Sequence, residues 1–189
     1  MSLKKYMAID LFLMLLILIL LEAASAFAFG MFNTEAYVLT HVMTITFLVM
    51  MRWGKFSLIH AFAGGIVYSI VYGGTVQNFA IYAIGNLGIA VSLLIFLKFG
   101  KERVRLSKML TIIYCGVGYL GINLSRTLIA FILLREPLLT TLTSFLTTDI
   151  LSFIITVLAI FIAKRQKGLF HDQKDYLVKL SEEEKLRGK

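Results

Sequence analysis

The chain alternates long runs of apolar residues with short clusters of charged and turn-forming residues. A bilayer core of about 30 Å requires about 20 apolar residues in an α-helix, with roughly 17 to 25 as the usual range. Six runs of about this length are present, and they occupy residues 6–29, 36–53, 56–72, 79–97, 109–134 and 138–163. The pattern therefore predicts an all-α integral membrane protein, a bundle of six transmembrane helices.

The second and third runs are separated by only four residues, Arg52, Trp53, Gly54 and Lys55. Trp is typical of the membrane interface, and charged residues beside a Gly favour a turn rather than a continued helix. We therefore expect a tight turn here, with the two runs crossing the membrane separately.

The basic residues predict the orientation of the chain. Loops on the cytoplasmic side of a membrane carry an excess of Lys and Arg. If the N-terminus is cytoplasmic, all of the 19 Lys and Arg residues except Arg126 and Arg135 fall on that side. We therefore expect both termini in the cytoplasm and a multi-pass protein of the plasma membrane.

The chain after residue 167 is polar, so we divide it into a transmembrane domain, 1–167, and a cytoplasmic tail, 168–189. Residues that are mostly apolar or aromatic recur in the tail at spacings of three and four, which predicts a short amphipathic helix. They are Leu169, Phe170, Gln173, Tyr176, Leu177 and Leu180. Such a helix lies on the inner leaflet or forms a docking surface for a cytoplasmic partner.

Composition narrows the functional classes. The chain of 189 residues is 59% hydrophobic with a mean hydropathy of +0.85, which excludes a soluble domain. Its net charge of +8 is distributed between the apolar runs, so we expect lipid rather than nucleic acid as its surroundings. The single cysteine, Cys115, excludes an intramolecular disulfide.

The sequence contains no motif for catalysis. The three histidines have no metal-binding spacing, and neither a nucleophile-elbow motif nor a phosphate-binding loop is present. We therefore expect no enzymatic activity, no cofactor and no metal.

The first run also has features of a secretory signal. Lys4 and Lys5 precede a Leu-rich segment, and the small residues 24–26 are typical of a cleavage site. The apolar run continues through residues 27–29, past that site, which favours a retained transmembrane helix.

Three ionisable residues in the predicted spans need a partner or a water-filled cavity, because a charge at the membrane centre costs about 2.5–3.5 kcal/mol on insertion scales. They are Glu22, Arg126 and Asp149. At about 1.5 Å per residue, Glu22 and Arg126 both lie roughly 12 Å below the outer surface, and Asp149 lies at a similar depth. Arg126 can therefore pair with either acid.

Other polar and aromatic residues gather in the same outer half of the spans. They are His41, Tyr68, Tyr72, Gln77, Asn78, Tyr82, Asn86 and Asn123. Asn123 shares a helix face with Arg126, and Tyr82 shares one with Asn86. This predicts an outward-opening cavity for a polar solute, or alternatively a purely structural ion pair between helices. The candidate substrate-binding residues are Glu22, His41, Tyr72, Tyr82, Asn86, Asn123, Arg126 and Asp149.

Small residues mark faces where helices can approach closely. Such faces occur at Ala61 and Gly65, at Gly85 and Gly88, at residues 116–121, and at Ala24 and Ala28 in the first span.

This architecture resembles the membrane-embedded substrate-binding component of energy-coupling factor (ECF) transporters. Members of that family have six helices with cytoplasmic termini, and the segments 52–56, 64–65 and 72–74 resemble the second and third helices of flavin- and thiamin-binding members. The resemblance implies uptake of a vitamin or related small molecule bound in the outer half of the bundle. It also implies a transmembrane coupling subunit, contacted by Ala24 and Ala28, and cytoplasmic ATPases.

A second interpretation assigns the chain to another class. Small multi-span proteins similar in size organise cell-wall synthesis as scaffolds. A non-catalytic scaffold of a cell-envelope assembly would use its membrane helices to recruit partners rather than to bind a solute.

Overall fold

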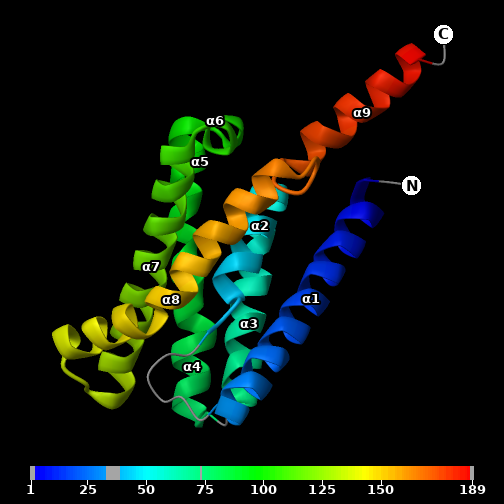
Figure 1. The fold of residues 1–189 in the computed structure, drawn as a ribbon. Coiled ribbons are helices and arrows are strands. Elements are labelled where there is room, and N and C mark those ends of the chain that lie inside the picture. Colours follow the sequence, from blue (N-terminus) through cyan, green and yellow to red (C-terminus); the bar gives the residue numbers. More distant parts are fainter. Residues whose placement is uncertain (1–2, 33–38, 73, 188–189) are drawn as a thin grey trace.

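The computed structural model describes residues 3–32, 39–72 and 74–187, and every regular element in these ranges is helical (Figure 1). In chain order they are α1 (Leu3–Phe32), α2 (Val42–Trp53), η1 (Gly54–Ser57), α3 (Leu58–Val71), α4 (Val76–Gly85), η2 (Asn86–Ser92), α5 (Leu93–Phe99), α6 (Lys101–Leu106), α7 (Lys108–Leu134), α8 (Leu138–Arg165) and α9 (Gln173–Arg187). The all-α prediction is confirmed for this part of the chain.

Within the described residues, five helical stretches are long and apolar enough to cross a membrane, which indicates a multi-pass membrane protein. They are Leu3–Ala28, Val42–Val71, Val76–Phe99, Lys108–Leu134 and Leu138–Arg165. Four of them correspond to one predicted run each. The second, Val42–Val71, covers most of the second and the third predicted runs.

That second stretch is not straight. Gly54, at the end of α2, has φ 63° and ψ −126°, a conformation that only glycine adopts readily. Val42, at the start of α2, lies against Gly64 in α3, where an added Cβ would be 2.8 Å from Val42 Cγ1. In one straight helix these residues would be about 33 Å apart. The chain therefore reverses at Gly54, where the sequence predicts a turn, and α2 and α3 lie side by side (Figure 1).

The core forms around α2, in which all twelve residues are buried. The Phe47 ring packs against Tyr114 of α7 at 4.9 Å, and the Tyr114 hydroxyl donates to the Phe47 carbonyl at 3.0 Å. At about 1.5 Å per residue, α2 is roughly 18 Å long, shorter than a bilayer core of about 30 Å.

The segment η2 makes the closest helix contact. An added Cβ at Gly88 would lie 2.2 Å from the carbonyl oxygen of Gly121 in α7, so only glycine allows this approach. The prediction that small residues mark close helix contacts is confirmed here, and also at Gly65 and Gly85. Gly116 differs, because no described atom lies within 4 Å of the position that an added Cβ would take there.

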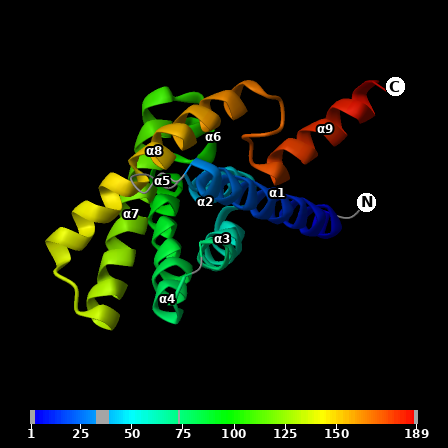
Figure 2. The same cartoon turned by 60° about the horizontal axis from the view of Figure 1, so that its bottom comes forward.

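The helices α1 and α9 lie at the periphery (Figures 1 and 2). Among the α1 side chains described, only Leu18 and Glu22 are buried. The tail helix α9 begins at Gln173, later than the predicted 168, because residues 166–172 form a turn that buries Phe170. Leu180, predicted on the apolar stripe, is exposed.

The helices of the bundle run between two opposite ends. The start of α1, η1, α6 and the start of α9 lie together, joined by contacts described below, and we call this the basic end. The α3–α4 and α7–α8 connections lie at the opposite end, which we call the far end (Figure 1).

Candidate functional site

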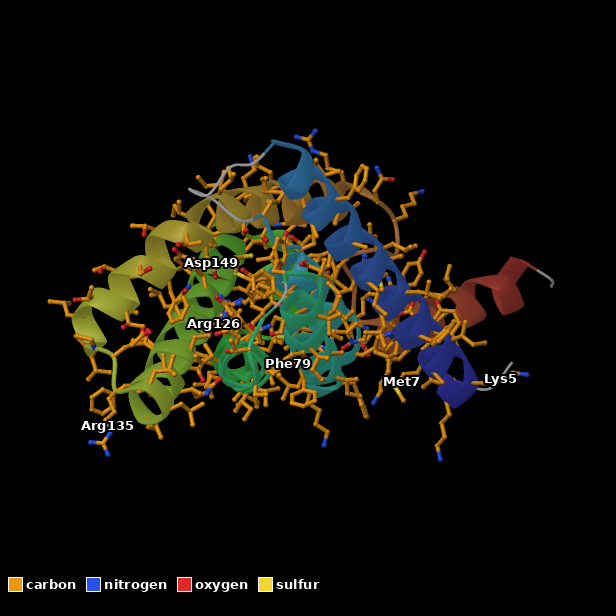
Figure 3. All side chains as sticks on the ribbon, turned by 90° about the horizontal axis from the view of Figure 1, so that it is seen from below. Lys5, Met7, Phe79, Arg126, Arg135 and Asp149 are labelled. Atoms are coloured by element: carbon orange, nitrogen blue, oxygen red, sulfur yellow. The ribbon has the colours of Figure 1, made fainter. Side chains whose placement is uncertain are left out.

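A buried polar network centred on Arg126 occupies the half of the bundle nearer the far end. Arg126, on α7, has 3% of its surface exposed, and its Nη1 donates to Asp149 Oδ2 on α8 at 2.5 Å. Figure 3 shows both side chains between the two helices, whereas Arg135 points away from the bundle. The predicted pairing of Arg126 with an acid is therefore found, and Asp149 is that acid.

Asn86 and Tyr82 complete the surroundings of the guanidinium. Asn86 Oδ1 accepts from Arg126 Nε at 2.9 Å and from Nη2 at 2.7 Å, and its Nδ2 donates to the Ala61 carbonyl at 3.2 Å. The Tyr82 ring faces the guanidinium at 4.9 Å, within cation–π range. Asn86 is the first residue of η2, and a 3₁₀ segment inside a helix marks strain or function.

Glu22 does not join this network. Its Oε1 accepts from Thr40 Oγ1 at 2.9 Å and from the His41 backbone N–H at 2.5 Å. Its Oε2 is buried and has no hydrogen-bond partner among the described residues. His41 thus contacts Glu22 through its backbone as the residue preceding α2, and the role of its imidazole in binding stays a prediction.

Asn123 makes no hydrogen bond to Arg126 in the described part of the chain, although the two share a helix face. It is fully buried, and its Nδ2 donates to the Tyr119 carbonyl of the same helix at 2.8 Å. Its Oδ1 has no partner in the described part of the chain.

Tyrosine rings extend the polar layer from the Arg126 network toward α1. The ring centroid of Tyr68 lies 4.5 Å from that of Tyr82 and 4.7 Å from that of Tyr72. Tyr72 lies at the C-terminal end of α3, where its hydroxyl comes near enough to Glu22 for an electrostatic interaction. The tyrosines therefore connect the two groups of predicted residues without placing them around one open space.

A cavity of about 210 Å³, the far-end cavity, lies between α4, the end of α7 and the start of α8. Its polar and aromatic lining consists of Asn78, Tyr82, Glu136, Thr141, Ser144 and Phe145. Of the candidate binding residues predicted from the sequence, only Tyr82 lines it. The hydroxyl-rich stretch at 140–148 and the acid before Pro137 were available signals that sequence reasoning did not use.

A second network, at the basic end, contains a residue that sequence reasoning missed. Asp10, on α1, accepts from Arg52 Nε at 2.9 Å and Nη2 at 2.6 Å, and from Trp53 Nε1 at 2.5 Å. Arg52 Nη1 donates to the carbonyls of Gly168 and Leu169. Since Asp10 lies inside the first predicted run, it was identifiable as a fourth charge in the spans.

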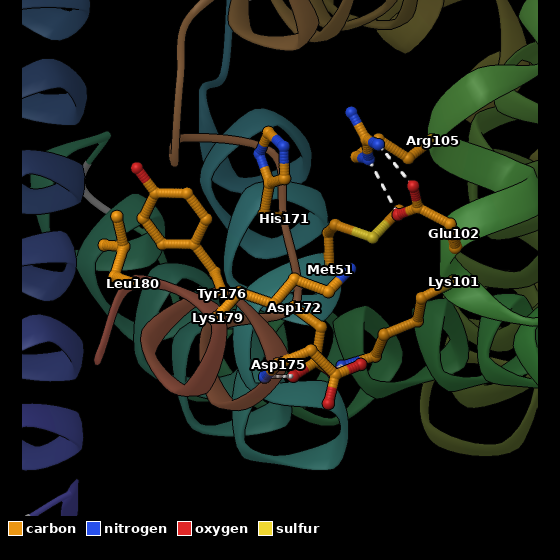
Figure 4. Close-up of a pocket in the computed structure, with 10 residues that line it drawn as sticks. All are labelled: Met51, Lys101, Glu102, Arg105, His171, Asp172, Asp175, Tyr176, Lys179 and Leu180. Carbon is orange, nitrogen blue, oxygen red and sulfur yellow. Dashed lines mark hydrogen bonds and ion pairs between the residues drawn. The ribbon is translucent and has the colours of Figure 1, made fainter. Parts of the chain in front are cut away.

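The basic end also has a cavity, of about 250 Å³, between α2, α6 and α9 (Figure 4). Lys101 pairs with Asp172 at 2.5 Å, and Arg105 pairs with Glu102. The hydrogen bonds from Arg105 hold the pKa of Glu102 below its usual range, and burial followed by the charge of Arg105 lowers the pKa of His171. These paired charges balance one another and leave no excess of one sign.

The remaining candidate residues are exposed or isolated. Ala24 and Ala28 are exposed on α1, and Cys115 is buried with a free thiol. No group of His, Cys, Asp and Glu side chains that could hold a metal ion occurs in residues 3–32, 39–72 and 74–187.

Comparison with known proteins gives no match: no family model, curated protein or solved structure is significantly similar to this chain.

Proposed function

We propose that this chain is a membrane-embedded solute-binding subunit of an ECF-type nutrient transporter, binding a vitamin or related small molecule near the outer surface of the plasma membrane. In this proposal the α2–α3 reversal lets the chain cross six times, with both termini cytoplasmic and the basic end inside. The far end is then extracellular.

The observation that carries the proposal is the far-end cavity. It combines two aromatic walls, Tyr82 and Phe145, with hydroxyl and amide groups, the combination typical of small-molecule sites. Tyr82 rests on Arg126 at 4.9 Å, so the buried network supports one wall of the cavity. The Arg126–Asp149 pair then positions the binding surface without contacting the solute.

The proposed partners are those that the resemblance to ECF substrate-binding components implies. The chain carries no ATP-binding motif, so a transporter subunit of this kind requires separate cytoplasmic ATPases and a transmembrane coupling subunit. The exposed face of α1 with Ala24 and Ala28 is the proposed contact for the coupling subunit, since small residues permit close helix packing.

A scaffold of a cell-envelope assembly is the second candidate. The sealing of Arg126 against Asp149 and Asn86 favours it, because these groups are satisfied without any solute. Under this alternative the polar network only fixes the helices, and filling the far-end cavity leaves the function unchanged.

The test uses the full chain in lipid nanodiscs and measures thermal stability with a panel of vitamins, amino acids and small amines. A binding solute should raise the melting temperature of the wild-type protein. Ser144→Trp should abolish the shift, because Ser144 lines the cavity. Thr143→Trp is the matched control, since its hydroxyl donates only to carbonyls of α8, those of Leu139 and Thr140. The absence of any stabilising solute, or a shift retained in Ser144→Trp, refutes the proposed site.

A further inference from the structure

Resting on the proposed function, we infer that the far-end cavity selects a small organic cation, an ammonium group carried on an apolar body about the size of one ring. The inference rests on the charge, the aromatic walls and the volume of the cavity, each taken in turn below.

Among the described residues that line the cavity, Glu136 alone is charged. Its Oε2 accepts from Thr141 Oγ1 at 3.1 Å, and it takes part in none of the ion pairs among the described residues. The neighbouring Arg135 does not neutralise it, because that side chain points away from the bundle in Figure 3. The mouth of the cavity therefore presents a carboxylate without a protein cation from the described part of the chain.

The backbone around Glu136 holds this residue, whose side chain is exposed, beside the cavity. Arg135 ends α7 in the left-handed conformation, with φ 58° and its N–H donating to the Phe131 carbonyl. Pro137 then precedes α8 and cannot continue α7, since its φ is fixed and it lacks an N–H. Glu136 is thus held in a short connection between two long helices.

The aromatic walls favour a cation as well. The rings of Tyr82 and Phe145 meet edge to face, with centroids 6.3 Å apart at 79°. Aromatic faces attract ammonium groups. Arg126 covers part of Tyr82, but its charge is already compensated by Asp149 at 2.5 Å. An anionic solute would instead meet the carboxylate of Glu136 and be repelled.

The volume limits the size of the occupant. An engineered cavity of about 150 Å³ holds one benzene molecule. The far-end cavity, at about 210 Å³, therefore has room for one ring and a short arm. Benzylamine, protonated at neutral pH, matches this description, and benzyl alcohol and benzoate are its neutral and anionic counterparts.

The experiment measures binding of these three probes to the full chain in dodecyl maltoside micelles, which carry neither a net charge nor an amine. Benzylamine should bind about tenfold more tightly than benzyl alcohol, and benzoate should not bind. Glu136→Gln should remove the tenfold preference while leaving benzyl alcohol binding unchanged. Glu102→Gln, which removes an exposed carboxylate at the basic end, should keep the preference.

The outcomes separate this inference from the proposed function. If other solutes bind but benzylamine has no advantage over benzyl alcohol, or if Glu136→Gln keeps the advantage, the cation inference is wrong while a solute site stands. If no solute binds at all, the cation inference and the proposed solute site are both wrong.

Repeating the measurement with phosphatidylethanolamine present tests the other source of an ammonium group. Loss of benzylamine binding there would assign the site to a lipid headgroup and overturn its role in solute uptake.

Discussion

The Arg126–Asp149 ion pair allows a quantitative test of what holds α7 and α8 together. Removing one member of a buried pair costs about 3–5 kcal/mol, because the other charge remains buried and uncompensated. Asp149→Leu leaves the guanidinium, 3% exposed, with only Asn86 and the Tyr82 ring. Arg126→Met leaves the Asp149 carboxylate without its ion-pair partner. It also removes both donors to Asn86 Oδ1, which adds roughly 1–3 kcal/mol to the destabilisation caused by this change.

The double variant should be much more stable than the two single effects imply. With both charges gone, the main remaining cost is the unsatisfied Asn86 Oδ1, roughly 1–3 kcal/mol. The single changes together cost at least about 7 kcal/mol, of which about 1 kcal/mol is the Asn86 cost that the double variant shares, so we expect a coupling energy of about 6 kcal/mol or more. Ordinary hydrogen bonds between membrane helices give a coupling of only about 0.6 kcal/mol on average.

The assay is reversible unfolding of the purified protein in mixed micelles, applied to the wild type, both single variants and the double variant. Arg105 and Glu102 provide the matched control, because their ion pair is largely exposed and such pairs contribute about 0–1 kcal/mol. A coupling energy below about 1 kcal/mol for Arg126 and Asp149 would show that the charges do not hold the helices together.

Three further predictions concern topology, packing and pH. Arg135→Cys should react with a membrane-impermeant maleimide on intact cells and Arg103→Cys only after permeabilisation; the reverse result would contradict the proposed orientation, in which the far end is extracellular. Gly88→Ala should destabilise the protein by about 1–3 kcal/mol in the unfolding assay because a Cβ meets backbone 2.2 Å away, whereas Gly116→Ala, with open space, should be neutral or stabilising. Burial lowers the pKa of His171 from its usual 6.5, so the unfolded chain binds the proton first and stability should fall as the pH drops through 6.5. His171→Gln should reduce that pH dependence, and an unchanged slope would exclude this histidine as a contributor.

Hydropathy and turn chemistry predict most of the fold. The apolar runs locate the long helices, and the residues at 52–55 predict the reversal because Gly54 can adopt a positive φ. The predicted start of the second run, residue 36, lies outside the described residues, and α2 itself begins only at Val42. Helix boundaries depend on local capping that a hydropathy pattern does not contain.

The candidate site was harder to predict, because depth along a helix says nothing about lateral position. Glu22 and Asp149 lie at similar predicted depths, yet α8 packs against α7 while α1 packs against α2 and α3. Only Asp149 can therefore reach Arg126, and Glu22 instead accepts hydrogen bonds from Thr40 and His41.

The shape of the far-end cavity depends on the separation between α4 and the first turns of α8, which both line it. In lipid the hydrophobic effect does not drive helices together, so van der Waals packing and polar contacts decide such positions. Among residues 138–149 of α8, only Thr141 and Asp149 are buried. The hydroxyls of Thr143, Thr147 and Thr148 donate to carbonyls of α8 itself and so do not attach it to a neighbour.

Two polar contacts join the first three turns of α8 to α7: the Arg126–Asp149 pair, and the Tyr119 hydroxyl, which donates to the Leu146 carbonyl at 2.5 Å. Thr141, Ser144 and Phe145, which line the cavity, all lie on those turns, beyond the pair. The costly ion pair therefore lies beside the cavity and not inside it, where it joins α8 to α7 while the residues beyond it form the cavity wall.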